Sequence, residues 1–302
     1  MRDAKQPLRG GALGLAMLIV ALWGGNSVAV SFSVDTLPPV AVAGIRFAMG
    51  TIVLFGWCVV RKIPFSATRS ELWMSLVAGF LLFTQISTFN VGVLWTNSTH
   101  GAMLINTFPF FVAAIEHWIT KGDRLTIRSM TGMFVAAVGV VVVMLDMAPE
   151  GATGSAFIAG DLILLLSSVL LAIRVVYVRV AVQRMEPGKL IFWHDIFGVA
   201  MFFAWSAATE SFENAHVTTA SMLGLLYQGL IVAGFCFVIH ASLLTRYTAS
   251  QLSVFSFATP IFGVFFSILL RNEPFTLAVA IGAACVATGI WAVSGAEWSR
   301  ER

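Results

Sequence analysis

Charged side chains are scarce in this chain of 302 residues. Asp, Glu, Lys and Arg together make up 11% of it, whereas roughly a quarter of a typical soluble domain is charged. Hydrophobic residues make up 58%, and the mean hydropathy is +0.89. So little charge excludes an ordinary soluble domain, and the sequence predicts an integral membrane protein.

Cysteine is also rare, and sequence motifs for enzymatic chemistry are missing. The three cysteines, Cys58, Cys236 and Cys285, all lie within apolar runs, so they suggest neither a disulfide framework nor a metal cluster. The histidines are scattered, and no His-Glu-x-x-His pair, nucleophile elbow or nucleotide-binding loop occurs. These absences disfavour an enzyme, and we expect no metal and no cofactor.

Long apolar runs are the main feature that the sequence does contain. They are long enough for helices to cross a hydrocarbon layer about 30 Å thick, and they lack the alternating pattern of a membrane barrel. Because only helices and closed barrels satisfy their backbone in lipid, the runs predict transmembrane helices. We predict ten, at 11–33, 38–60, 71–94, 98–120, 126–145, 158–180, 188–207, 220–243, 249–270 and 275–295.

The second half of the chain repeats the design of the first, because residues 97–126 have a counterpart at 248–276. A shift of about 150 residues aligns Pro109 with Pro260, Asp123 with Glu273, Gly132 with Gly282 and Gly139 with Gly289. Such duplication is typical of transporters and predicts two five-helix units, 11–145 and 158–295. We expect the glycines to allow close helix packing and each acid to cap the helix that follows it.

Positive charge is concentrated in alternate loops. With the N-terminus in the cytoplasm, the inner segments carry fifteen of the 18 Lys and Arg residues, and the outer segments carry only Arg271. The net charge of +3 therefore indicates orientation and not a nucleic-acid-binding surface, and both termini are cytoplasmic. Because each unit has five spans, the second enters the membrane from the opposite face. The predicted fold is an all-α integral membrane protein with ten transmembrane helices, arranged as two inverted repeats around a central cavity.

Pro109 and Pro260 lie in the middle of the fourth and ninth predicted spans. Each is about eleven residues from one end of its span, roughly 16 Å deep at 1.5 Å per residue. Each proline frees the carbonyl four residues earlier, at Ile105 or Ser256, and predicts a helix kink. Such a kink is either a packing feature or part of a cavity wall, where water or polar groups bind the freed carbonyl.

Several local patterns together carry a resemblance. A mid-helix proline is followed by an acid, in Gly-Asp-Arg-Leu-Thr and in Asn-Glu-Pro-Phe-Thr, and then by two glycines seven residues apart. The opening carries Trp23-Gly24-Gly25-Asn26, Leu37-Pro38-Pro39 and Arg46-Phe47. These patterns resemble the EamA-type family of the drug/metabolite transporter superfamily and its YddG-like exporters. The resemblance occurs once in each half and covers almost the whole chain. The resemblance implies an inner-membrane exporter of amino acids, other metabolites or cationic drugs.

Few charged residues lie inside the predicted spans, where a charge is costly unless it is paired or hydrated. Arg46 and Asp195 each lie eight residues after the proline that opens their span, roughly 12 Å deep and at equivalent positions of the two units. They form either an ion pair between the units or part of a substrate site. Arg174, which aligns with Asn26, either binds a substrate carboxylate or extends to the membrane interface. The family often has an aromatic residue where Arg174 stands, which disfavours a purely cationic substrate.

Uncharged polar groups and aromatic rings complete the predicted pocket. The polar groups suit a zwitterionic or neutral solute. For each residue taken alone, a hydrogen bond between helices is the alternative explanation. The rings supply apolar walls. The predicted cavity residues are Trp23, Asn26, Arg46, Gln85, Phe89, Asn90, Asn106, Phe110, Arg174, Tyr177, Trp193, Asp195, Gln228 and His240.

Together with the resemblance, these residues predict a secondary transporter that exports amino acids or related small metabolites across the bacterial cytoplasmic membrane by alternating access. A multidrug or lipophilic-cation exporter is the alternative. A channel is a further one, although neither rings of like charge nor a filter repeat occurs. The predicted partners are a small-molecule substrate and the lipid bilayer, with no nucleic acid. The exact substrate, proton coupling and oligomeric state stay open.

Overall fold

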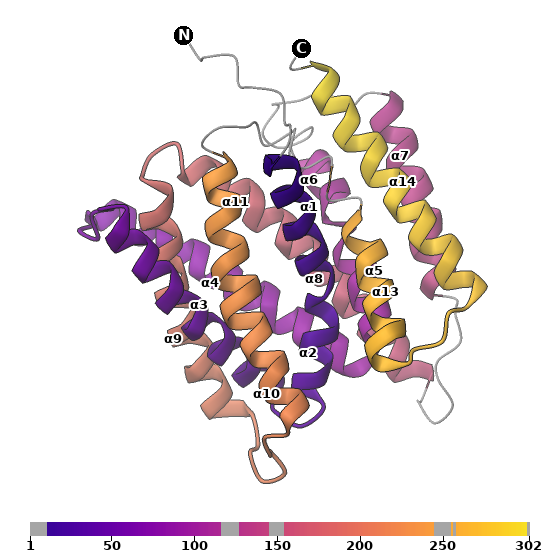
Figure 1. Ribbon diagram of the computed structural model, residues 1–302, viewed down its shortest axis with the longest axis horizontal. Coiled ribbons are helices and arrows are strands. Elements are labelled where there is room, and N and C mark those ends of the chain that lie inside the picture. The colour runs from indigo at the N-terminus through magenta and orange to yellow at the C-terminus, as the bar shows by residue number, and fades with distance from the viewer. Residues whose placement is uncertain (1–10, 116–126, 145–153, 245–254, 256–257, 301–302) are drawn as a thin grey trace.

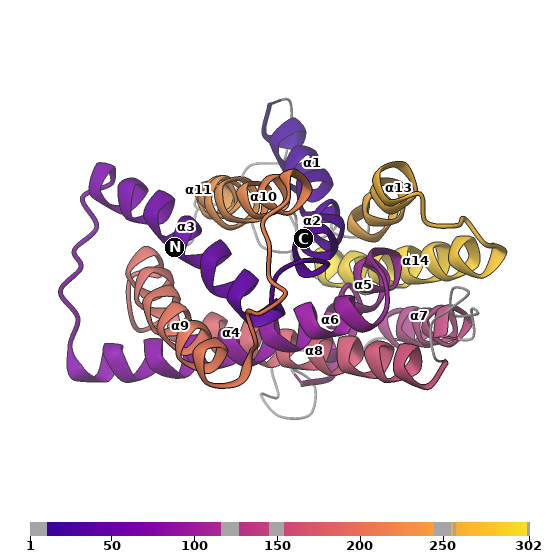
Figure 2. The ribbon, with the colours of Figure 1, turned by 90° about the horizontal axis from the view of Figure 1, so that it is seen from below.

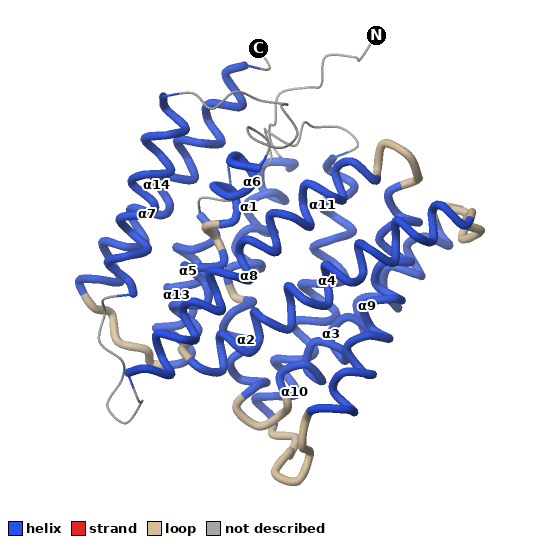
Figure 3. The backbone as a smooth tube through the Cα atoms, turned by 180° about the vertical axis from the view of Figure 1, so that it is seen from behind, coloured by secondary structure: helices blue, strands red, loops and turns tan. Residues whose placement is uncertain are grey.

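Most of the described chain is helical. The computed structural model describes residues 11–115, 127–144, 154–244, 255 and 258–300, and no strand occurs among these residues (Figure 3). The helices are α1 (Gly11–Gly24), α2 (Asn26–Val34), α3 (Pro39–Val60), α4 (Arg69–Trp95), α5 (Ser98–Ile105), α6 (Phe108–Ile115), α7 (Ile127–Met144), α8 (Gly154–Ala181), α9 (Pro187–Thr209), α10 (Thr219–Leu226), the π-helix η2 (Tyr227–Cys236), α11 (Phe237–Leu244), α13 (Thr259–Arg271) and α14 (Leu277–Arg300).

Length and apolar character explain why these segments are helices. Six segments of the described chain are long and apolar enough to cross a bilayer, and α7, α13 and α14 contain shorter apolar stretches. A helix pairs its own backbone groups, which lipid cannot do for it. Each range predicted as a span overlaps at least one described helix. The all-α class is therefore confirmed.

The first predicted span is broken at Gly25, between α1 and α2. A Cβ atom at Gly25 would lie 2.7 Å from the hydroxyl oxygen of Tyr227, so a larger residue there would displace this hydroxyl. That hydroxyl donates a hydrogen bond to the carbonyl of Leu22, at 2.6 Å. The break is therefore held by a side chain that lies about two hundred residues further along the chain.

The fourth predicted span is also broken, directly before Pro109. α5 ends at Ile105, and α6 begins at Phe108. Pro109 thus lies in the first turn of a new helix, where its missing N–H costs little. Pro260 likewise lies at the start of α13, and Ser256 lies outside the described residues. Where the sequence predicted kinks within continuous helices, the structure has both prolines at helix starts.

Helices α7 and α14 lie side by side at the opposite end of the molecule from α3 and α9 (Figures 1 and 2). Glycines bring the two helices together. A Cβ atom at Gly139 would lie 2.6 Å from the Cβ of Cys285, and one at Gly289 would lie 2.6 Å from the carbonyl oxygen of Gly132. Side chains at these positions would push the helices apart, so the glycines serve close packing, as their spacing predicted.

Helix α3 packs against both α9 and η2, and α4 packs against α8 and α9. The contact of α3 with η2 is also close. A Cβ atom at Gly229 would lie 3.1 Å from the carbonyl oxygen of Arg46, and one at Gly50 would lie 2.7 Å from the Cβ of Ala233. Stretches of π-helix are rare and are frequent at functional sites, and this one lies against the part of α3 that carries Arg46.

Two glutamates from the second half cap helices of the first half. The carboxylate of Glu210 accepts hydrogen bonds from the N–H groups of Val40 and Ala41, at 2.8 and 2.9 Å, where α3 begins. Glu273 accepts from the N–H groups of Ser98 and Thr99, at 3.0 and 2.9 Å, where α5 begins. The expectation that Glu273 caps the next helix was therefore wrong, because its carboxylate reaches the free N–H groups of α5 instead. Asp123 lies outside the described residues.

Candidate functional site

The structure brings together the charged residues that the sequence placed inside the membrane. Arg46 on α3 interacts electrostatically with Arg174 on α8 and with Asp195 on α9, and Arg174 also interacts with Asp195. Arg46 and Asp195 are each 5% exposed, whereas Arg174 is partly exposed. These three residues are called the charged group below. With two guanidinium groups and one carboxylate, it has an excess of one positive charge.

The guanidinium of Arg46 is buried without a matching acceptor. Among the described residues, its Nε and Nη1 atoms have no hydrogen-bond partner. Its carbon Cζ lies over the ring of Phe47, 4.9 Å from the ring centroid. Arg46 and Asp195 are both described, and no side-chain nitrogen of Arg46 lies within 4.0 Å of the Asp195 carboxylate. Since buried donors are nearly always paired, these N–H groups are free to bind an anionic oxygen.

Asp195 also has an oxygen that accepts no hydrogen bond from the described residues. This atom, Oδ1, lies 3.1 Å from Nδ1 of His194. The Nδ1 atom, however, lies 2.8 Å from the carbonyl of Ile191, in hydrogen-bonding geometry, so its hydrogen is directed to the backbone. The charged group therefore offers free guanidinium donors and a free carboxylate acceptor.

Two predicted polar residues on α4 bind neighbouring helices. Gln85 donates from Nε2 to the Ser167 hydroxyl at 3.2 Å, and that hydroxyl donates back to the Gln85 carbonyl at 2.7 Å. Asn90 donates from Nδ2 to the carbonyl of Pro39, at 2.8 Å. These bonds join α4 to α8 and α3. The contacts are those expected of helix packing.

Three further predicted polar residues lie at helix breaks or contacts. Gln228 donates from Nε2 to the carbonyl of Ala29 at 3.0 Å and to the hydroxyl of Ser33 at 2.8 Å, which joins η2 to α2. Asn106 donates to the carbonyl of Ala102, at 2.6 Å, where α5 ends. Asn26 begins α2, and its Oδ1 atom is buried without a hydrogen-bond partner in the described chain.

The predicted aromatic walls do not surround one point. Phe89 and Phe110 belong to separate hydrophobic clusters. Tyr177 donates to the carbonyl of Met74 at 3.2 Å, so its hydroxyl joins α8 to α4. Trp23 contacts the ring of His240 edge to face, with centroids 5.1 Å apart. The rings thus pack between different pairs of helices.

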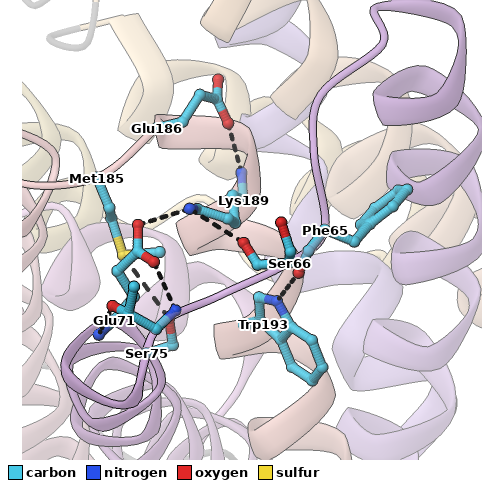
Figure 4. Close-up of polar contacts among 9 residues, drawn as sticks. Phe65, Ser66, Glu71, Ser75, Met185, Glu186, Lys189 and Trp193 are labelled. Carbon is cyan, nitrogen blue, oxygen red and sulfur yellow. Dashed lines mark hydrogen bonds and ion pairs between the residues drawn. The ribbon is translucent and has the colours of Figure 1, made fainter.

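Trp193 belongs to a polar contact region where α9 begins (Figure 4). Its indole nitrogen donates to the carbonyl of Phe65, at 2.9 Å. Lys189, one turn earlier, bonds the carboxylate of Glu71 at 2.5 Å and the carbonyl of Ser66 at 3.3 Å. The predicted pocket residue Trp193 therefore holds the loop between α3 and α4.

A buried pair that the sequence reasoning missed joins α5 to α8. The Nδ1 atom of His100 lies 2.8 Å from Oδ1 of Asp161, and the two side chains are 3% and 0% exposed. The sequence did contain one signal for this pair, because Asp161 is an acidic residue inside an apolar run. Among the described residues, no cluster of three or more His, Cys, Asp or Glu side chains could hold a metal ion.

Two segments of the chain, residues 11–145 and 158–295, match the model of the EamA-like transporter family. Together they cover most of the sequence. A solved crystal structure of another protein superposes with a TM-score of 0.68, over 94% of this chain and 98% of that one. The two sequences are 18% identical, so this likeness shows a shared fold.

Similar proteins span the same length. The chain is 22% identical to the uncharacterized transporter YoaV of Bacillus subtilis, over 90% of this chain and 93% of that protein. It is 23% identical to a probable amino-acid metabolite efflux pump of Escherichia coli, over 95% of this chain and 96% of that protein. A protein of Salmonella typhimurium with the same description is 22% identical over 92% of both chains.

Proposed function

Because this chain belongs to the EamA-like transporter family, and is therefore a multi-pass membrane transporter, we propose that it exports amino acids or related small metabolites by alternating access. Two of its relatives are described as probable amino-acid metabolite efflux pumps. That description supports the substrate class proposed here, and the charged group supplies the chemistry for it.

The observation that carries the proposal is the buried guanidinium of Arg46, with donors that no described residue accepts. A guanidinium presents a planar fork of N–H groups that matches a carboxylate. Arg174 adds a second positive charge to the same group. In this proposal Arg46 and Arg174 bind the substrate carboxylate, and the free oxygen of Asp195 accepts a hydrogen bond from the substrate ammonium.

The sign of the charged group favours a zwitterion over a cation. Arg46 and Arg174 both repel a cationic drug, and Asp195 alone offsets only one of them. A zwitterion adds one charge of each sign, and each finds an opposite partner. Lipophilic cations are therefore the second candidate class, supported by the carboxylate of Asp195 and the rings of Trp23 and His240.

We propose further that 11–145 and 158–295 are inverted repeats. The match of one family model to both segments supports this. So do three contacts between helices of equivalent predicted spans: α3 with α9, α5 with α13, and α7 with α14. A two-fold axis between two units produces such pairs. It also relates Arg46 on α3 to Asp195 on α9.

The proposed orientation places both termini in the cytoplasm and the protein in the bacterial cytoplasmic membrane. It rests on the distribution of Lys and Arg. A thiol-reactive probe that cannot cross the membrane tests it in whole cells. Thr36→Cys and Ser211→Cys, in outer loops, should react, whereas Ser66→Cys, in an inner loop, should react only after the cells are opened. Reaction of all three in intact cells would contradict the inverted topology.

Counterflow in proteoliposomes tests the function. Vesicles containing the purified protein are loaded with one unlabelled amino acid at a time, and uptake of a labelled amino acid is measured. The proposal expects exchange that saturates and is accelerated by substrate on the opposite side. A parallel series uses lipophilic cations. Exchange of cations without exchange of any amino acid would overturn the proposed substrate class, and uptake without acceleration would favour a channel.

A further inference from the structure

Three aromatic rings from three segments gather where α3 ends and α9 begins. The ring centroid of Phe55, on α3, lies 5.2 Å from that of Phe65, in the loop after α3, and 6.0 Å from that of Phe192, on α9. The centroids of Phe65 and Phe192 are 4.8 Å apart. These three residues are called the ring cluster below. The proposed substrate site uses none of them.

Exposed apolar side chains continue the ring cluster along α3. Ile52, Phe55 and Val59 are 70%, 48% and 52% exposed, and spacings of three and four residues place them on one face of the helix. At 100° per residue, Phe55 lies half a turn around α3 from buried Arg46. This apolar stripe is therefore on the membrane-facing side of α3, where lipid acyl chains pack.

Positive charge is concentrated just beyond the ring cluster. Residues 61–71 and 184–189 contain five basic and two acidic side chains. Both acids are already engaged, because Glu71 pairs with Lys189 and Glu186 accepts a hydrogen bond from the backbone N–H of Lys189, at 2.6 Å. The basic side chains that form no ion pair with a described residue are Arg61, Lys62, Arg69 and Arg184, all of them exposed.

The rings and the free basic side chains share one corner of the molecule. Arg61 follows Phe55 by six residues, about 9 Å along a helix. Lys62 precedes Phe65 by three residues. The loop that joins α3 to α4 runs along the edge of the molecule, beside α9 (Figure 2). Rings, apolar stripe and positive charge therefore form one continuous exposed surface.

Lys62 occupies a backbone position that glycine usually fills. The N–H groups of Lys62 and Ile63 donate to the carbonyls of Val59 and Cys58, at 3.0 and 2.9 Å, and close the end of α3. This pattern requires a left-handed residue, most often Gly, and the φ angle of Lys62 is +55°. A side chain at such a φ angle costs conformational energy. The chain nevertheless has a charged residue here, next to the apolar stripe.

We propose that this corner is a binding site for an anionic phospholipid. Arg61 and Lys62 bind the lipid phosphate, the ring cluster lies at the level of the headgroup, and an acyl chain lies along the apolar stripe. Aromatic rings and basic clusters are typical of contacts with the membrane interface and with anionic lipids. In the proposed orientation the corner faces the cytoplasmic leaflet. The site does not depend on the identity of the transported solute.

Charge and apolar surface together select this ligand. A soluble phosphate would neutralise the basic side chains but would leave the apolar stripe uncovered. An uncharged lipid would cover the stripe but would leave the excess of positive charge without a counter-charge. An anionic phospholipid satisfies both surfaces at once.

The first experiment measures the midpoint of thermal unfolding of the full chain in an uncharged detergent while short-chain phosphatidylglycerol is added. A ligand that binds the folded protein raises this midpoint. We expect a rise that saturates. Phosphatidylcholine of the same chain length, and glycerol phosphate, which has no acyl chains, should give little rise. No rise with phosphatidylglycerol, or an equal rise with either of the other compounds, would overturn the proposal.

Two substitutions locate the site. Lys62→Gly removes the ammonium and suits the left-handed backbone, so the midpoint without lipid should stay the same or rise. Arg61→Gln removes the neighbouring charge. A basic residue near an anionic lipid surface contributes about fivefold in affinity, so each variant should raise the half-saturating phosphatidylglycerol concentration by roughly that factor. The double variant should raise it about 25-fold if the two effects are independent.

Arg128→Gln is the matched control. It removes one exposed basic side chain at the start of α7, at the opposite end of the molecule, and should leave the half-saturating concentration unchanged. An unchanged concentration in the double variant, or an equal increase in the Arg128 variant, would overturn the site. If Arg61→Gln fails to fold, Lys62→Gly still decides, because its backbone is compatible with the native turn.

The second experiment tests the site in a bilayer. Proteoliposomes contain phosphatidylglycerol that carries a photoreactive diazirine in one acyl chain, and mass spectrometry identifies the crosslinked peptides after irradiation. We expect crosslinks to be enriched several-fold in residues 52–65 and 191–197 over those in α7 and α14. The double variant should lose this enrichment. Crosslinks spread evenly over all exposed apolar helices would show that the lipid acts only as solvent and would overturn the proposal.

Discussion

Lys189 and Glu71 form an ion pair that joins α9 to α4, with side chains 10% and 15% exposed. Arg271 and Asp35 form another, which joins the end of α13 to the end of α2. Each pair links the second half of the chain to the first. In the proposed topology, the Lys189 pair lies at the inner face and the Arg271 pair at the outer face. A carrier that opens to each side in turn must break one pair while it keeps the other.

The first prediction concerns the inner ion pair. Glu71→Gln removes the charge that holds Lys189, so the inner end should open more often. We expect a cysteine at buried Ser75, on α4, to react several-fold faster with a probe added from the inner face. Asp35→Asn, at the outer pair, is the matched control and should leave this rate unchanged or lower. Equal acceleration by both substitutions would show that the pairs serve general stability and not gating.

The second prediction concerns Arg46 and Arg174. A hydrogen bond to a charged group contributes about 1.5–3 kcal/mol, so its loss weakens binding roughly tenfold to a hundredfold. Arg46→Gln and Arg174→Gln should each raise the half-saturating amino-acid concentration in counterflow by about that factor. Arg46→Lys should recover only part of it, because lysine lacks the planar fork. Arg128→Gln, on an exposed residue of α7, should have no effect.

The third prediction concerns the contact of α7 with α14. Gly139→Val places atoms where the Cβ of Cys285 already lies, and overpacking of this kind costs about 1–3 kcal/mol. We expect a lower midpoint of thermal unfolding in detergent. Gly56→Val is the control, since nothing lies within 4 Å of a Cβ atom at Gly56. Unchanged stability of the Gly139 variant would mean that the helices separate at little cost.

The fourth prediction concerns Gln85. If its amide serves the contact with Ser167, Gln85→Ala and Ser167→Ala should each destabilise the protein, and a double-mutant cycle should give a coupling of about 0.6 kcal/mol. The half-saturating substrate concentration should stay the same. A marked rise in that concentration for Gln85→Ala, without a rise for Ser167→Ala, would place Gln85 in the substrate site instead.

The helices could be predicted from sequence because the membrane makes a local property decisive. An apolar run of sufficient length must form a helix in lipid, whatever its neighbours are. The glycines of α7 and α14 were recognisable for a similar reason, since their spacing is visible in one segment. The breaks at Gly25 and before Pro109 depend on distant contacts. Tyr227, which occupies the space beside Gly25, cannot be found from the sequence around the glycine.

The candidate site was only partly predictable. Charges inside apolar runs are rare, so Arg46, Arg174 and Asp195 could be selected without a structure. An amide or a ring gives no such signal, because the sequence does not say whether its partner is a helix or a solute. Trp193, for example, bonds the backbone of a loop. Asp161 carried the same signal and was missed, and its partner His100, 61 residues away on another helix, gives none.

The π-helix η2 lies between α10 and α11, inside a segment that is apolar enough to cross the membrane. Its bonding pattern inserts extra residues into each turn compared with an α-helix. If one residue fewer were π-helical, the helix that follows, α11, would be turned by about 100° around its axis. His240 lies just beyond η2 and faces Trp23 of α1. The point at which η2 ends therefore decides which side of α11 meets α1.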